Sequence, residues 1–226
     1  MTKKIRIMTA RYKNICLPVS EAKKVRGFFS NLDYLDSNLH NHTASGEEIY
    51  RYPLVQYKVL KKNPVIVAAE DGIKSIHAHL MNETEIKIGD RVYTDVSLDI
   101  HLAELPVGDS RAVRQYVFLT PWLALNQGNY EKYQKMDEEG RKSLLEHILI
   151  GNILSLCKGF DVTIENTLQA EMELRSIPVL YKEKRMEGFT GKFRINCCIP
   201  DMCGIGKGTA RGFGTVKLIK DKDAEG

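Results

Sequence analysis

The sequence predicts an α+β protein of two tandem ferredoxin-like domains, with a glycine-rich loop near the C-terminus. Its 226 residues suffice for two small domains, since a domain usually has about 100–200 residues. Hydrophobic residues make up 43% and charged residues 27%, which are ordinary values for a globular protein. Strand and helix patterns occur twice in a similar order, and residues 106–109 between them (Pro-Val-Gly-Asp) have the composition of a linker. We therefore expect domains at residues 1–106 and 109–226.

The first domain is expected to begin with a strand, because apolar and polar residues alternate over residues 4–13. Pro18 and Ser20 then open a helix whose apolar residues recur at helical spacing. Residues 50–60 and 64–69 are typical of two strands joined by a turn, and residues 71–81 of a short helix. Two further strands are expected at residues 84–88 and 91–102, around a Gly-Asp turn.

The second domain is expected to repeat this order. A strand is predicted at residues 112–122 and helices at 129–135 and 141–156. Further strands are predicted at residues 160–174, 191–199 and 215–219. Because strand, helix and paired strands recur, we interpret both halves as ferredoxin-like. No sequence repeat accompanies the duplication, which rests on element order alone.

Charge is distributed unevenly along the chain. Residues 1–62 contain 12 Lys and Arg against 5 Asp and Glu, residues 63–181 contain 11 against 18, and residues 182–226 contain 10 against 6. If the two basic ends meet in space, they form one basic face. Such a face attracts a polyanion, because each neutralised phosphate releases counterions. The alternative is an ordinary solvated surface on which basic residues happen to cluster.

The cytoplasm is the expected compartment. No apolar run approaches the ~18 residues that a membrane span needs, and the N-terminus lacks the apolar segment of a signal peptide. The five cysteines show no Cys-x-x-Cys or Cys/His zinc spacing. We therefore expect reduced thiols and neither a membrane partner nor a structural metal.

Residues 204–214 contain five glycines, one lysine and one arginine. Glycine lets backbone N–H groups approach an anion closely, which favours a phosphate-binding loop. A Walker A loop is excluded because no Gly-Lys-Ser/Thr closes the segment, and a dinucleotide fold because a strand follows. A flexible surface loop is the alternative. The candidate binding residues are Gly204, Gly206, Lys207, Gly208, Arg211, Gly212 and Gly214.

A second motif places His40 and His42 on either side of Asn41 in a polar turn. Such a pair can ligate a metal together with a third residue, can be purely structural, or can serve as an acid and a base. The last role is chemically reasonable because imidazole titrates near pH ~6.5. The other four histidines form no pattern that supports a metal site.

The segment after this motif, residues 50–58, interleaves aromatic and basic residues. On a strand, Tyr50, Tyr52, Gln56 and Lys58 share one face. Aromatic side chains can stack bases while Arg51 and Lys58 hold phosphates. Tyrosine is also an ordinary strand residue, which is the structural alternative.

Together the His-Asn-His motif, residues 50–58 and the glycine loop resemble one family, the CRISPR repeat-processing endoribonucleases of the RAMP superfamily, in their paired-histidine, subtype I-B-like form. The resemblance implies two ferredoxin-like (RRM-like) domains and cleavage of CRISPR precursor RNA within its repeats, without metal or cofactor. By this resemblance His40 and His42 correspond to the catalytic pair, and the glycine loop to an RNA-contacting loop. Tyr50 and Lys58 are our candidates to complete the site, with Arg51 and Tyr52 as further RNA-binding residues.

The residue chemistry agrees with this activity. RNA supplies a 2′-OH nucleophile, so the enzyme needs a base, an acid and positive charge for the developing oxyanion. The products would carry a 2′,3′-cyclic phosphate and a 5′-OH. Two alternatives stay open: a non-catalytic RAMP RNA-binding subunit of a CRISPR effector complex, and a metal-dependent enzyme with His40 and His42 as ligands. Repeat RNA is the expected partner, and other complex subunits or a second copy of the chain are further candidates.

Overall fold

The computed structural model describes residues 2–32, 36–40 and 51–220, and only the backbone of His40. The chain forms two compact units. The N-terminal unit comprises Lys4–Leu105 and Thr209–Gly212, and the C-terminal unit comprises Met1–Lys3, Pro106–Gly208 and Phe213–Gly226. A short segment from near the C-terminus therefore belongs to the N-terminal unit.

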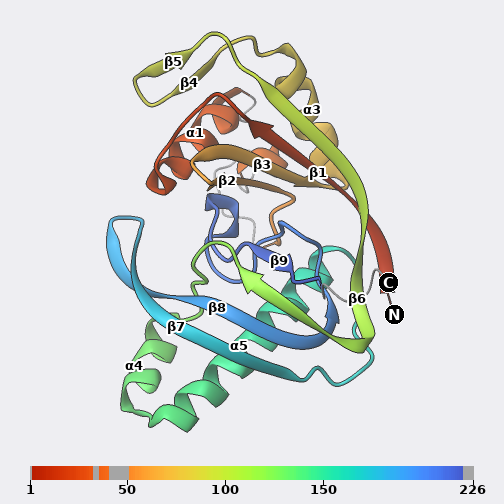
Figure 1. The fold of residues 1–226 in the computed structure, drawn as a ribbon, viewed down its shortest axis with the longest axis vertical. Coiled ribbons are helices and arrows are strands. Elements are labelled where there is room, and N and C mark those ends of the chain that lie inside the picture. Colours follow the sequence, from red (N-terminus) through yellow and green to blue (C-terminus); the bar gives the residue numbers. More distant parts are fainter. Residues whose placement is uncertain (1, 33–35, 41–50, 221–226) are drawn as a thin grey trace. The chain divides into compact units, whose positions relative to one another are not determined.

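The N-terminal unit is an antiparallel sheet with helices on one face (Figure 1). Its strands and helices are β1 (Thr2–Tyr12), η1 (Val19–Glu21), α1 (Ala22–Leu32), α2 (Ser37–His40), β2 (Val55–Leu60), β3 (Asn63–Ala69), α3 (Asp71–Asn82), β4 (Ile86–Ile88), β5 (Arg91–Tyr93) and the first part of β6 (Leu98–Phe118). The strand order β2-β3-β1-β6, with α1 and α3 as connections, is that of a ferredoxin-like fold.

The core of this unit lies between the sheet and the helices. Alternate residues of the strands, such as Ala10, Tyr57 and Ile66, point to the same face and are fully buried. Helix α1 contributes Phe29, whose ring stacks on Tyr57 with the centroids 5.8 Å apart. Helix α3 contributes Ile76 to the same cluster. Apolar residues at every second position of the strands and at helical spacing in α1 and α3 therefore form one shared core on one side of the sheet.

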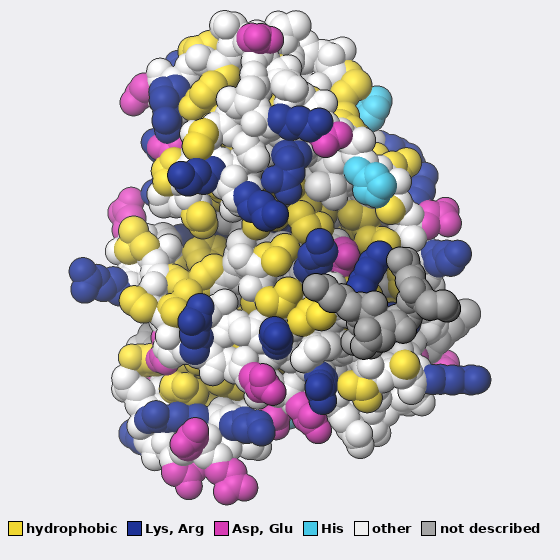
Figure 2. Space-filling model, in the orientation of Figure 1, with side chains coloured by type: hydrophobic (Ala, Val, Ile, Leu, Met, Phe, Trp, Pro, Cys, Tyr) yellow, Lys and Arg dark blue, Asp and Glu magenta, His cyan; other side chains and the backbone are white. Residues whose placement is uncertain are grey.

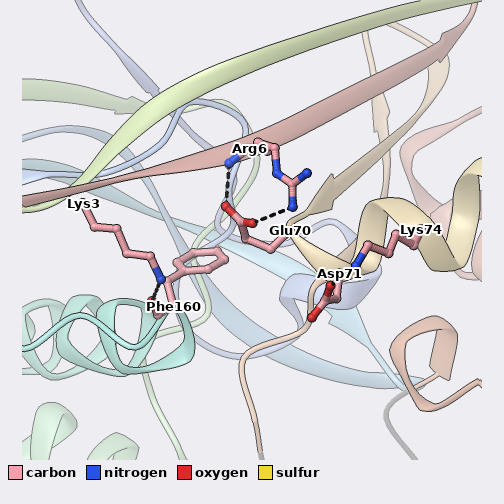
Figure 3. Close-up of polar contacts among 6 residues, drawn as sticks. All are labelled: Lys3, Arg6, Glu70, Asp71, Lys74 and Phe160. Atoms are coloured by element: carbon pink, nitrogen blue, oxygen red, sulfur yellow. Dashed lines mark hydrogen bonds and ion pairs between the residues drawn. The ribbon is translucent and has the colours of Figure 1, made fainter.

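Polar contacts hold the start of α3, and one of them joins it to β1 (Figure 3). The Arg6 amide on β1 donates to Glu70 Oε1 at 2.7 Å, and its guanidinium donates to Glu70 Oε2 at 3.2 Å. Glu70 has a φ of 47° and directly precedes α3. In the first turn of that helix, Lys74 pairs with Asp71 at 2.9 Å, and this bond lowers the pKa of the Asp71 carboxyl.

The C-terminal unit has the same order of strands. It contains the second part of β6, α4 (Gln127–Lys135), α5 (Glu138–Gly159), β7 (Ala170–Tyr181), β8 (Lys184–Cys198) and β9 (Val216–Leu218). Strand β7 pairs with β8, β8 with β6, and β6 with β9. The second connecting helix of a ferredoxin-like unit is replaced by the glycine-rich segment, which contains the 3-10 turn η2 (Thr209–Arg211). Tandem ferredoxin-like units are thus confirmed.

Aromatic side chains fill the core of the C-terminal unit. Trp122 is fully buried and stacks on Phe118 with ring centroids 5.5 Å apart. Phe118 in turn contacts Phe193 at 5.0 Å. Helix α5 begins at the cap Asp137, whose carboxylate accepts from the Gly140 amide.

Several predicted boundaries were wrong. Residues 106–109 do not form a loop between domains but lie within β6, where Val107 is fully buried, although the two compact units do divide between Leu105 and Pro106. The strand predicted over residues 50–60 starts only at Val55, and the one predicted over 160–174 starts at Ala170. Strand β8 begins at Lys184, earlier than predicted, because β7 and β8 form one long hairpin. The helices predicted at 71–81, 129–135 and 141–156 are confirmed.

Candidate functional site

Strand β2 carries a hydrogen-bonded chain of polar side chains. Lys58 Nζ donates to Gln56 Oε1 at 2.8 Å, and Gln56 Nε2 donates to the Tyr52 hydroxyl at 2.8 Å. Gln56 and Lys58 share one face of the strand and are only 2% and 0% exposed, whereas Tyr52 lies outside the strand. A buried ammonium is costly unless it is hydrogen-bonded. Gln56, which the sequence had not marked as functional, supplies that acceptor.

Helix α2 ends at His40 and is held by hydrogen bonds to three neighbouring elements. Leu39 is 1% exposed, and its carbonyl accepts from Ser30 Oγ of α1 at 3.0 Å. The Tyr57 hydroxyl of β2 also donates to this carbonyl at 3.5 Å. On the other side, Asn38 Nδ2 donates to Ser75 Oγ of α3 at 2.9 Å. The backbone that leads into the His-Asn-His motif is therefore firmly anchored.

Arg51 contacts this helix from beyond the motif. Its guanidinium donates to Ser37 Oγ at 2.9 Å and to Asn38 Oδ1 at 2.8 Å. One side chain therefore ties α2 to the chain that follows residues 41–50. The side chain of His40 and all of His42 and Tyr50 lie outside the described residues, so the predicted catalytic pair stays a prediction.

The glycines of the C-terminal loop have packing reasons for their presence. Positive φ values between 64° and 88°, which residues with a Cβ rarely adopt, occur at Gly206, Gly208, Gly212 and Gly214. A Cβ on Gly212 would lie 2.9 Å from the Tyr57 carbonyl oxygen, and one on Gly214 would lie 2.0 Å from that of Ile205. Close approach of backbone segments thus explains much of the glycine pattern without a ligand.

The amides of this loop differ in what they bind. Gly212 donates to Thr209 O at 3.1 Å and Gly214 to Pro121 O at 2.8 Å, so both amides are used within the protein. The amides of Gly206 and Gly208 donate to no acceptor within residues 2–32, 36–40 and 51–220. Any phosphate contact by backbone N–H groups is therefore best sought around residues 206–208.

The two basic residues of the loop belong to different units. Lys207 is exposed in the C-terminal unit, with Nζ 5.4 Å from the centroid of the Tyr181 ring. Arg211 is half-buried in η2, which belongs to the N-terminal unit and packs against β2. Residues from the two basic ends of the chain thus meet in the N-terminal unit.

Basic charge is also widespread at the surface. Figure 2 shows Lys and Arg side chains spread over the visible face, with Asp and Glu side chains between them.

Among the described residues, no three His, Cys, Asp or Glu side chains are grouped so as to hold a metal ion. That finding does not cover His40 and His42. In the described part of the chain, none of the helices has the length and apolar character needed to cross a membrane.

Two family models match almost the whole chain. The model of the Cas6b N-terminal domain matches residues 3–105, and that of the Cas6b C-terminal domain matches residues 108–219. A solved structure of Cas6b is 34% identical, with a TM-score of 0.91 over 96% of this chain and 100% of that chain. Another, described as the CRISPR RNA processing endoribonuclease Cas6b, is 32% identical with a TM-score of 0.79 over the same shares.

A relative is also found in Methanocaldococcus jannaschii. This uncharacterized protein is 38% identical over 143 residues, which make up 63% of this chain and 97% of that protein. The matches confirm the resemblance to CRISPR repeat-processing endoribonucleases of the RAMP superfamily. Since the two family models together span residues 3–105 and 108–219, the chain belongs to the Cas6b family.

Proposed function

We propose that this protein is an endoribonuclease that cleaves CRISPR precursor RNA within its repeats. The observation that carries the proposal is the 32% identity, over 96% of the chain, to a structure described as a CRISPR RNA processing endoribonuclease. The anchored helix α2, which ends at the first residue of the His-Asn-His motif, supports a site in the N-terminal unit.

The proposed reaction is metal-independent attack by the RNA's own 2′-OH on the adjacent phosphate. One histidine of the His40 and His42 pair takes the 2′-OH proton as the 2′ oxygen forms its bond to phosphorus. The other gives a proton to the 5′ oxygen as the P–O5′ bond breaks. The products are a 2′,3′-cyclic phosphate and a 5′-OH. Lys58 and Tyr50 are proposed to stabilise the developing oxyanion.

Lys58 is well positioned for this role but is not accessible to RNA in the structure. Its ammonium is held by a hydrogen bond to Gln56, so its position is defined before RNA binds. It is also 0% exposed, so a phosphate reaches it only if the side chain or its surroundings move. We therefore expect the contribution of Lys58 to be smaller than that of either histidine.

RNA binding is proposed to involve the glycine loop and the segment before β2. Lys207 with the amides of Gly206 and Gly208 offers a cation and two donors at one place. Arg211 and Arg51 add charge in the N-terminal unit. The hydrogen bonds from Arg51 to α2 give it a positioning role as well, so its replacement would affect both binding and the site.

A double substitution tests the mechanism. His40→Ala with His42→Ala should abolish cleavage of repeat RNA while RNA affinity is kept, because a positioned acid or base contributes about 10²–10⁴-fold each. The matched control is His101→Ala with His147→Ala, which removes two exposed histidines from β6 and α5. Cleavage should continue in EDTA, and a 2′-deoxy nucleotide before the scissile phosphate should block it.

Each alternative predicts a different result. A non-catalytic subunit of an effector complex would bind repeat RNA and leave it intact. A metal-dependent enzyme would lose activity in EDTA and regain it with a divalent ion. Cleavage of the 2′-deoxy substrate would exclude the 2′-OH mechanism itself. Size-exclusion chromatography with and without repeat RNA separates a homodimer from a monomer.

A further inference from the structure

A groove of about 640 Å³ opens in the C-terminal unit, between the start of α4 and the β7–β8 hairpin. Figure 1 shows α4 beside this hairpin. Lys207 of the glycine loop reaches the same groove. The volume lies in the range of about 300–1,000 Å³ that is usual for small-ligand sites. All of its lining residues belong to one unit, so the groove does not depend on how the two units are arranged.

Three exposed cations line the groove. Lys184 and Arg185 come from the start of β8, and Lys207 from the glycine loop. None of the three forms an ion pair with any residue that the structure describes. The carboxylate of Glu187, which also lines the groove, accepts from Ser176 Oγ at 2.6 Å. Three cations against one carboxylate favour an anionic ligand.

The groove also offers a flat aromatic surface. Tyr130 of α4 is 38% exposed, and its hydroxyl accepts from Gln134 Nε2 at 2.7 Å, which restricts the ring. Pro178 of β7 and Met186 of β8 add apolar surface. A phosphate ion alone would contact only the cations, whereas a nucleotide has a phosphate for the cations and an aromatic base for the tyrosine ring. Base–aromatic stacking is the usual way in which proteins hold unpaired nucleotides.

We propose that this groove binds an unpaired nucleotide of the RNA, with the base on Tyr130 and the flanking phosphates on Lys184, Arg185 and Lys207. The inference rests on the proposed function in taking RNA as the polyanion. A base pair inside a helix is covered on both faces by its neighbours and cannot stack on a tyrosine, so we infer that the ligand is single-stranded RNA rather than the interior of a duplex.

The test compares two fluorescein-labelled RNAs on the full chain by fluorescence anisotropy. One is an oligouridylate of about eight nucleotides, within the site size of a typical single-strand binder. The other is an RNA hairpin with a stem of similar length, in which a non-nucleotide linker closes each end of the stem so that no base face is exposed. Tyr130→Ala should raise the Kd for the oligouridylate by about 5- to 150-fold, because stacking contributes about 1–3 kcal/mol per base. The Kd for the hairpin should stay the same.

Three further variants separate stacking from charge. Tyr130→Phe keeps the ring and should bind the oligouridylate as the wild type does. Lys184→Ala with Arg185→Ala should flatten the dependence of log K on log salt by about 1.4, the value for two lost contacts to single-stranded RNA. Lys132→Ala with Lys135→Ala is the matched control, since both are exposed cations of α4 outside the groove.

Two outcomes would overturn the proposal. An unchanged oligouridylate Kd for Tyr130→Ala would mean that no base stacks there, and an equal loss for the hairpin would mean that duplex RNA occupies the groove. Photo-crosslinking of an oligonucleotide with 5-iodouridine gives a second readout, since the crosslinked peptide should contain Tyr130. These measurements need no cleavage. If the protein cuts no repeat RNA, the proposed function is refuted, but the binding measurements still show whether the groove holds an unpaired nucleotide.

Discussion

Gly206→Ala gives a sharp test of why the C-terminal loop is rich in glycine. Gly206 has a φ of +83°, and a Cβ there would lie 2.6 Å from Trp122 Nε1 and 2.8 Å from Asn152 Oδ1. These two atoms form a hydrogen bond of 3.0 Å beside the fully buried indole of Trp122. Alanine must therefore adopt a left-handed backbone and also push the two side chains apart.

The expected loss of stability follows from these two effects. The left-handed conformation costs a residue with a Cβ about 1–2 kcal/mol. A buried donor that loses its acceptor costs about 1–3 kcal/mol more. Since 1 kcal/mol shifts the Tm of a protein of this size by about 2–4 °C, a fall of roughly 4–20 °C is expected.

The loss of stability is measured by urea unfolding followed by tryptophan fluorescence. The signal comes from the perturbed residue itself, because Trp122 is the only tryptophan of the chain. Gly151→Ala is the matched control: Gly151 lies in α5 with nothing within 4 Å of its would-be Cβ. Alanine there should stabilise the protein by about 0.5–1 kcal/mol. If Gly206→Ala unfolds at the wild-type urea concentration, the packing explanation for this glycine is refuted. A loss of RNA affinity alone would then assign it to binding.

Three further predictions concern charge and pH. Glu138→Lys with Glu139→Lys should leave repeat-RNA affinity nearly unchanged in anisotropy, but should lower stability by about 0.3–1 kcal/mol per charge, because both acids occupy the first turn of α5. Lys207→Ala with Arg211→Ala should weaken RNA binding and flatten its salt dependence, and an unchanged salt slope would remove both from the interface. Burial raises the pKa of the Tyr57 phenol above its ordinary value of 10.0, so the unfolded chain ionises first and stability should fall as the pH rises above that value. Tyr57→Phe should lessen this alkaline loss in urea unfolding, and an equal loss in both proteins would contradict the stated cause.

Local periodicity in the sequence was enough to predict most helices and several strands. In α5, Leu145, Leu149 and Ile153 recur at helical spacing, and all three are buried. The turn at Gly89 was predicted from the Gly-Asp sequence, and the structure agrees, since the φ of 64° at this residue suits glycine. Such signals depend on neighbours within a few residues, which the sequence displays directly. The His-Asn-His motif and the glycine-rich loop were also visible in the sequence, together with the family that they resemble, whereas the catalytic role of His40 and His42 stays a prediction.

The β7–β8 hairpin shows where local signals fail. Its turn consists of Lys182 and Glu183, whose φ values of 47° and 66° would favour Gly or Asn. Pro178 lies within β7, where a proline normally argues against a strand. Strand β7 is at the edge of its sheet, so the missing N–H is tolerated there. Pairing with β8 over twelve residues overrides both local preferences.

The environment of the candidate site depended on tertiary structure for a related reason. Alternation along residues 50–58 correctly placed Gln56 and Lys58 on one face, but gave no sign that both are buried. The segment Thr209–Gly212 packs with the N-terminal unit, although about 150 residues separate it from β2. The sequence by itself therefore determined the order of most elements and the family, and it predicted which residues carry the chemistry. Only the tertiary structure decided which side chains are buried or brought together, because contacts between distant segments depend on the packing of the whole chain.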